Sequence, residues 1–350
     1  MKEKLNRFYI FKLSKLILIA FLFHSCSTNI NQVFKEEPVT KESVAAPVEA
    51  SPEIAEAFKM ETSSEKKEKK IKTKKKKEIV KDAPKILPPD LEKLYEPIDL
   101  NSKEVWNSFV PYATNEEETL MKVAFFGITV GFMKINIGPM VQVKNTKAYH
   151  LTVKLKSADF YSFIYSLNNT VETFIDAKTI TPLKYSLIQR ESKQNVDDFQ
   201  VFDVEKRQTH FWYKREKLKT KEVQTKNDVA YITQYFQDSL SSLFFTRGLP
   251  LAPGKVLEFP LVNKGKTVMV KIKVAGIEDI KVNNKFQKAY RIEASSYPLE
   301  GEKKDEYVLF WYSQDPEKRL LKFSAKVKFG DVSGEMVDYK QGPPLSLGDQ

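Results

Sequence analysis

The residue types that most often carry out chemistry in proteins are few in this sequence. It contains one cysteine, Cys26, and three histidines, His24, His150 and His210. A disulfide within the chain is therefore impossible, and the count excludes a zinc site built from cysteine and histidine. We expect the protein to hold no metal and no cofactor.

A serine nucleophile is the next candidate. Ser239 and Ser242 lie three residues apart beside Asp238, so a helix would place both hydroxyls on one face. However, the sequence has no Gly-x-Ser-x-Gly elbow and no glycine-rich phosphate loop. We expect His150 to be exposed on the polar side of a strand, whereas His210, flanked by aromatic residues, either lines a pocket or packs there. The sequence predicts a protein that is not an enzyme.

Asp315 and Arg319 form a further charged pair, on either side of Pro316 and between two predicted strands. In a functional role, Arg319 would present its guanidinium to an anionic group. In a structural role, Asp315 caps the turn and Arg319 pairs with it or lies along the sheet. We favour the structural role.

The formal net charge of +11 arises outside the predicted folded part. Residues 1–25 carry five basic residues against one glutamate, and residues 59–81 carry eleven lysines against four glutamates. The remaining residues sum to zero, so the basic pI does not indicate a DNA-binding face. We therefore expect no nucleic-acid partner.

The N-terminal residues 1–25 have the pattern of a signal peptide. Basic residues precede an apolar run at residues 16–23, which is too short to cross a bilayer as a helix. The following His24-Ser25-Cys26-Ser27 resembles the lipobox of bacterial lipoproteins, which implies cleavage before Cys26 and a diacylglycerol on its sulfur. Ser27 in place of Asp implies an anchor in the outer membrane, with the domain in the periplasm. The alternative is a secreted or soluble periplasmic protein with a free thiol.

Residues 26–90 have the composition of a disordered tether, because prolines and a lysine-rich run replace any sustained apolar period. The tether would reach about 200 Å at full extension. Its basic run either contacts anionic lipid or a cell-wall polymer, or is a solvated spacer. A β-rich domain at residues 91–343 and a disordered tail at residues 344–350 complete the chain.

Beyond the tether, apolar and polar residues alternate with a period of two. Tyr149, Leu151 and Val153, for example, alternate with polar neighbours, which is typical of antiparallel strands with one wet face. Gly330-Asp331 fits a two-residue hairpin turn. Strands are predicted at residues 119–126, 128–137, 140–143, 148–156, 170–175, 183–190, 198–203, 209–214, 218–223, 256–262, 267–275, 288–294, 307–312, 320–329 and 332–339.

Helical signals are rarer. Apolar residues recur at three- and four-residue spacing from Ile232 to Phe244, and Gly248 suits a helix C-terminus, so residues 231–254 predict one amphipathic helix. A short helix is also predicted at residues 102–109. Short strands with connections too short for crossover helices predict an all-β, mostly antiparallel domain, either an open barrel or a sandwich, with the amphipathic helix packed on it.

Four stretches together resemble the bacterial domain of unknown function family 3108. They are FGITVGF, SLNNTVETFID with TPLKYSL, DSLSSLFFTRGLPLAPGK, and LFWYSQDPEKRLLKFSAKVKFGDVSGEM. The resemblance implies an exported, mostly β envelope protein of uncharacterised activity, and it supplies no catalytic residue. The motif residues in these stretches, for which we expect structural roles, are Gly131, Asp238, Arg247, Gly254, Trp311, Asp315, Arg319 and Gly330.

The aromatic residues suggest a function. In an open barrel they would line a site for an acyl chain or similar amphiphile, although core packing is the simpler interpretation. Our leading hypothesis is a non-catalytic envelope lipoprotein that binds or carries an apolar ligand or envelope component. The alternative is a structural or assembly scaffold that docks a periplasmic or cell-wall partner. The proposed ligand-binding residues are Phe163, Trp212, Tyr235, Phe244 and Trp311.

Overall fold

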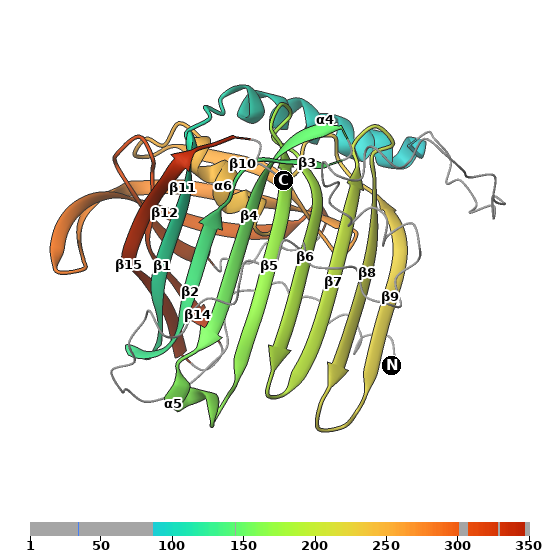
Figure 1. The fold of residues 1–350 in the computed structure, drawn as a ribbon. Helices are drawn as coiled ribbons and strands as arrows, with labels where there is room; N and C mark the ends of the chain where they lie inside the picture. Colours follow the sequence, from blue (N-terminus) through green and yellow to red (C-terminus); the bar gives the residue numbers. More distant parts are fainter. Residues whose placement is uncertain (1–33, 35–86, 144, 301–306, 328–329, 347–350) are drawn as a thin grey trace, which may run out of the picture.

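The chain folds around one antiparallel sheet. The computed structural model describes residues 34, 87–143, 145–300, 307–327 and 330–346, so the predicted signal peptide, Cys26 and most of the tether lie outside the described residues. In the described part, fourteen strands follow the order β10-β11-β12-β13-β14-β15-β1-β2-β4-β5-β6-β7-β8-β9, and β3 pairs with β4. Figure 1 shows β4–β9 as a broad curved wall, with β11 and β12 crossing behind it. The fold class is therefore the open, mostly antiparallel β structure that the sequence predicts.

Most strands extend slightly beyond their predicted limits. The strands are β1 Asn115–Phe125, β2 Ile128–Ile137, β3 Val141–Val143, β4 Thr146–Ser157, β5 Leu167–Asp176, β6 Pro182–Glu191, β7 Gln194–Asp203, β8 Gln208–Lys217, β9 Val223–Tyr231, β10 Val256–Asn263, β11 Lys266–Val282, β12 Lys285–Pro298, β13 Tyr307–Ser313, β14 Leu320–Val327 and β15 Gly330–Pro344.

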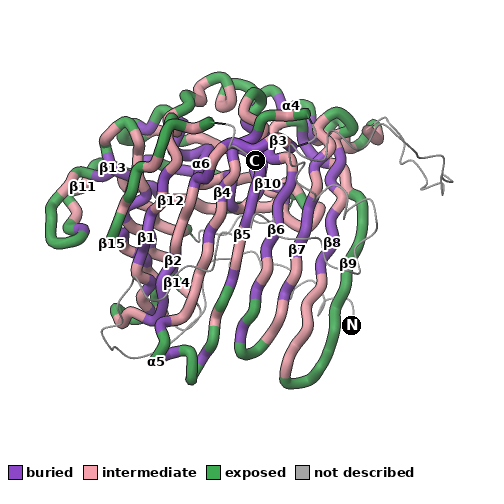
Figure 2. The backbone as a smooth tube through the Cα atoms, in the orientation of Figure 1, coloured by how far each residue is buried: buried purple, intermediate pink, exposed green. Residues whose placement is uncertain are grey.

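The curvature of the sheet encloses one main apolar core. Tyr149, Leu151 and Val153 of β4 point into this core, as their alternation predicts, and residues from nearly every strand join them. The outer side of β4 is less exposed than expected, because the His150 ring stacks on Phe174 at 4.5 Å and lies against Glu172. The prediction of an exposed His150 was wrong, since cross-strand neighbours cover the imidazole. Figure 2 shows the burial along these strands.

The predicted helix at residues 231–254 is much shorter in the structure. Tyr231 ends β9, and only Ser241–Gly248 form a helix, α6. The preceding segment is irregular, with bends at residues 234–235 and a turn at residues 239–240, and Gln237 forms an isolated bridge with Leu261 of β10. The carboxylate of Asp238 accepts hydrogen bonds from the backbone N–H groups of Leu240 and Ser241 and so begins the helix there.

Helix α4, Pro89–Asn107, is longer than the predicted helix at residues 102–109. It begins with a proline in its first turn, where the missing N–H costs nothing. Its buried residues are Tyr95, Asp99 and Ser102, two of which are polar, so the sequence has no apolar stripe to indicate it. A four-residue helix, α5 Asp159–Ser162, lies between β4 and β5.

Two further predictions fail at the sheet edge and at the last hairpin. The predicted strand at residues 218–223 is mostly turn, and β9 follows it. Because β9 is an exposed edge strand, it lacks apolar alternation. Val327 pairs with Gly330, so Gly330 and Asp331 belong to β15 rather than to the turn.

Candidate functional site

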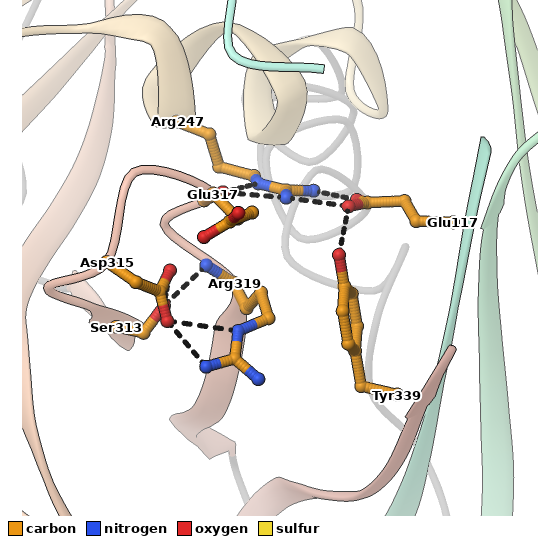
Figure 3. Close-up of polar contacts among 7 residues, drawn as sticks. All are labelled: Glu117, Arg247, Ser313, Asp315, Glu317, Arg319 and Tyr339. Atoms are coloured by element: carbon orange, nitrogen blue, oxygen red, sulfur yellow. Dashed lines mark hydrogen bonds and ion pairs between the residues drawn. The ribbon is translucent and has the colours of Figure 1, made fainter. Parts of the chain in front are cut away.

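A buried polar network surrounds Arg247 at the end of α6. Its guanidinium donates to both carboxylate oxygens of Glu117 on β1, and Tyr339 of β15 donates to the same carboxylate at 3.0 Å (Figure 3). Nε and Nη2 also donate to the backbone carbonyl of Glu317, at 3.1 and 2.8 Å. The network joins α6, β1, β15 and the β13–β14 turn.

The electrostatics keep Arg247 charged although it is only 8% exposed. Burial disfavours the charged guanidinium, but Tyr112 and Glu117 beside it raise the pKa of Arg247 above its ordinary value. The guanidinium also lies 4.2 Å from the centre of the Tyr112 ring. Since its acceptors come from the chain itself, we assign this arginine a structural role.

Asp315 and Arg319 pair with each other, as expected for a structural role. Arg319 Nε and Nη2 donate to one Asp315 oxygen at 3.1 and 2.5 Å, and Ser313 donates to the other at 2.7 Å (Figure 3). Partial burial opposes ionisation of Asp315, but the bonds from Arg319 and Ser313 lower its pKa. The Arg319 guanidinium lies 5.1 Å from the ring centre of Tyr339. Tyr339 thus contacts both ion pairs.

Two carboxylates are fully buried on the inner side of the sheet. Asp238 accepts hydrogen bonds from two backbone N–H groups and from Thr173, and burial raises its pKa to about 6. Burial likewise raises the pKa of Asp198 to about 6, and Lys264 lies 3.9 Å away. Ser239 and Ser242 lie near Asp238 in sequence, but the Ser242 hydroxyl donates to the backbone oxygen of Ser239. Within the described ranges, no three His, Cys, Asp or Glu side chains are placed to hold a metal ion.

The proposed ligand-binding residues do not come together. Phe163 follows α5 and is highly exposed, whereas Trp212 of β8 is buried beside Phe199, away from the main core. Trp311 belongs to a separate cluster and donates its indole N–H to Glu278 at 2.8 Å. Tyr235 and Phe244 both belong to the aromatic layer described next, in which Tyr235 contacts Trp106 and Phe244 contacts other rings.

An aromatic layer lies between α4, α6 and the sheet. Trp106 of α4 contacts Phe245 of α6, with ring centres 4.3 Å apart, and Phe109 stacks on Phe245 at 5.4 Å. Phe245 in turn meets Phe259 of β10 at 5.1 Å. We define the aromatic layer as Trp106, Phe109, Tyr112, Tyr149, Tyr235, Phe244, Phe245 and Phe259.

The motif glycines have local structural explanations. A Cβ on Gly131 of β2 would lie 2.5 Å from the backbone oxygen of Lys156 on β4, so the strands could not approach as they do. Gly254 and Gly330 have positive φ angles of 82° and 140°, which favour glycine. His210 lies on β8 and is partly buried.

Sequence reasoning missed Glu117, Tyr339, Phe245 and Phe259. Glu117 stands in a run of three glutamates, and nothing in the sequence marks the middle one as the partner of Arg247. The two residues are 130 positions apart, so only the folded sheet brings them together.

The chain belongs to a family described as "Protein of unknown function (DUF3108)", whose model matches residues 120–337. This confirms the family resemblance. Among curated proteins, no sequence matches this chain significantly.

Several solved structures show likeness at low sequence identity. A beta-barrel-like protein of domain of unknown function DUF1849 from Brucella abortus is 7% identical, with a TM-score of 0.40, over 65% of this chain and 98% of that chain. A candidate exported protein with a YmcC-like fold from Bacteroides fragilis is 8% identical, with a TM-score of 0.30, over 66% of this chain and 98% of that chain. A candidate lipoprotein from Parabacteroides distasonis is 10% identical, with a TM-score of 0.28, over 67% and 99%.

None of the helices in the described residues has both the length and the apolar character to cross a membrane.

Proposed function

We propose that the protein is a non-catalytic cell-envelope lipoprotein that binds an apolar ligand or envelope component between helix α4 and the sheet. The predicted acylation of Cys26 would anchor the protein in the outer membrane, with the domain in the periplasm. The aromatic layer beneath α4 is the observation that carries the proposal.

Helix α4 covers this layer without joining the hydrogen-bonded ladder of the sheet. Its polar contacts with the rest of the described chain are few: Tyr95 donates to the backbone oxygen of Tyr231 at 3.2 Å, and Asp99 pairs with Arg207 and accepts from the backbone N–H of Gln234 at 2.8 Å. Moving α4 would therefore break few hydrogen bonds and would uncover several large rings.

The polar atoms within the layer favour an amphiphilic ligand. The indole N–H of Trp106 and the hydroxyl of Tyr112 are buried and have no hydrogen-bond partner in the described part of the chain. A buried donor without a partner is costly, so an acceptor on a ligand would stabilise the site. The expected ligand has an apolar body that packs against the rings and a polar end that accepts a hydrogen bond.

Native mass spectrometry of the gently purified protein, with organic extraction of bound molecules, tests the proposal. A stoichiometric amphiphile is expected, and Trp106→Leu should lower its occupancy. Trp212→Leu is the matched control, because Trp212 is buried on the sheet outside the layer. An apoprotein that stays free of ligand after incubation with envelope lipids would refute the proposal and favour the scaffold hypothesis.

A further inference from the structure

Apolar side chains are exposed together at one end of the sheet. Phe126 is 56% exposed, Phe160 51%, Phe163 90% and Ile164 60%. We call these four residues the α5 end. Figure 1 shows α5 at the lower end of the strands, opposite the end that α4 covers.

The backbone places these residues on neighbouring connections. Phe126 lies in the turn between β1 and β2, and α5 directly follows β4, which pairs with β2. The backbone N–H of Ala158, just before α5, donates to the oxygen of Val130 in β2 at 2.9 Å. The α5 end is therefore one continuous part of the fold.

Buried rings support two of the exposed rings. Phe126 packs edge-on against Phe125 with ring centres 4.5 Å apart, and Phe160 packs against Tyr161 at 5.5 Å. Phe125 and Tyr161 both belong to the main core. Two of the exposed rings are thus in contact with rings of the main core.

The β6–β7 and β8–β9 turns at this end carry exposed lysines. Lys193 lies between β6 and β7, and Lys219 and Lys221 lie between β8 and β9. Figure 2 shows these two turns at the same end of the strands as α5. The acidic residues in these turns and in α5 are Asp159 and Glu222. The α5 end is apolar, and the neighbouring turns carry a slight excess of lysine. This combination is complementary to the interface of an anionic bilayer.

The exposed apolar area is modest and is divided among separate side chains. If each aromatic side chain contributes about 200 Å², the three phenylalanines expose roughly 400 Å². A stable protein–protein interface buries about 800 Å² of total surface on each partner, apolar and polar together, and the two surfaces must match in shape. A bilayer needs no complementary shape and can receive each ring separately.

We propose that the α5 end inserts its phenylalanines into the interface of an anionic lipid bilayer, in addition to any anchor at Cys26. This contact orients the domain, with β-strand ends toward the lipid and α4 away from it. The inference is independent of a ligand beneath α4.

Fluorescence quenching by brominated lipid tests the contact. Full-length Phe163→Trp protein is reconstituted in vesicles of phosphatidylethanolamine and phosphatidylglycerol, and the fluorescence gained over the wild type is measured. Phe286→Trp is the matched control, because Phe286 is 75% exposed but lies in the β11–β12 hairpin. We expect brominated lipid to quench the added signal of Phe163→Trp at least twice as strongly as that of Phe286→Trp.

Two further experiments test whether the contact depends on anionic lipid and on the exposed phenylalanines. Replacing phosphatidylglycerol by phosphatidylcholine should reduce the quenching, and adding Phe126→Ser and Phe160→Ser to Phe163→Trp should abolish the difference from the control. Equal quenching of the two tryptophan variants would overturn the proposal. Protection of position 163 only when another envelope protein is added would also overturn it, in favour of a protein partner.

Discussion

The buried pair of Arg247 and Glu117 gives the sharpest prediction on stability. Both side chains are less than a tenth exposed and are joined by two hydrogen bonds. Arg247→Met would leave the Glu117 carboxylate buried, with the Tyr339 hydroxyl as its remaining hydrogen-bond donor among the described residues. Removing one partner of a buried ion pair typically costs about 3–5 kcal/mol. We expect the free energy of unfolding to fall by that amount.

A double-mutant cycle separates the ion pair from packing. Glu117→Gln alone should cost about 3 kcal/mol, because it leaves the arginine buried without its counterion. The double variant should cost less than the sum of the two single variants by at least about 2 kcal/mol, since neither charge then remains unpaired. Urea unfolding followed by tryptophan fluorescence measures each value.

The control for the cycle is an exposed ion pair. Lys288 and Asp279 lie 3.2 Å apart, and both side chains are more than 60% exposed. Asp279→Asn should therefore change the free energy of unfolding by less than about 1 kcal/mol. Additive effects of Arg247→Met and Glu117→Gln, or a loss below 1 kcal/mol for Arg247→Met, would refute the reasoning.

Three more predictions follow from single features. The pKa of Asp198 is raised to about 6 in the folded protein, against 3.8 ordinarily, so its contribution to stability is full below pH 3.8 and is lost as pH rises through 6. Urea unfolding between pH 5 and 8 measures the free energy of unfolding, which should decline less steeply with pH in Asp198→Asn than in the wild type. The same slope in both proteins would contradict this. Gly131→Ala should destabilise the fold by about 1–3 kcal/mol, because the new Cβ would meet the backbone oxygen of Lys156, whereas Gly276→Ala meets no atom within 4 Å and should have little effect. Thermal unfolding distinguishes the two glycine variants. Cys26→Ser should move most of the protein from the membrane fraction to the soluble fraction, and an unchanged membrane fraction would reject lipidation.

Strand positions were the most predictable part of the fold. The predicted strand at residues 128–137 coincides with β2. The predicted strand at residues 148–156 lies within β4, where Tyr149, Leu151 and Val153 alternate with more exposed polar neighbours as the sequence indicates. The edge strand β9 escaped prediction because an exposed strand needs no alternation. Only the last residues of helix α4 were predicted, because its earlier part buries the polar Asp99 and shows no apolar stripe in the sequence.

The failure of the long helix has a different cause. Residues 231–254 have a helical period, yet Gln237 pairs with the backbone of β10, since its N–H donates to Pro260 and its oxygen accepts from Val262. The strand edge offered hydrogen bonds that local propensity does not anticipate. Tertiary structure therefore overrode the periodic pattern and left only the last two turns helical.

In the candidate site, too, local contacts were predictable from the sequence and long-range contacts were not. The sequence predicted that Asp315 and Arg319 pair, because four residues around a proline turn bring them into reach. It could not predict that Glu117 holds Arg247, or that Phe245 rather than Trp212 completes an aromatic layer with Trp106. These contacts depend on which strands become neighbours.

The sequence by itself determined that this is an antiparallel β protein of its family, with its excess charge outside the folded domain. Those properties follow from local alternation, motif residues and composition, which need no three-dimensional information. Only the tertiary structure decided which aromatic rings form one layer and which are exposed at the α5 end. A strand sequence states that a side chain faces one side of the sheet, but the curvature and strand order decide what lies opposite it.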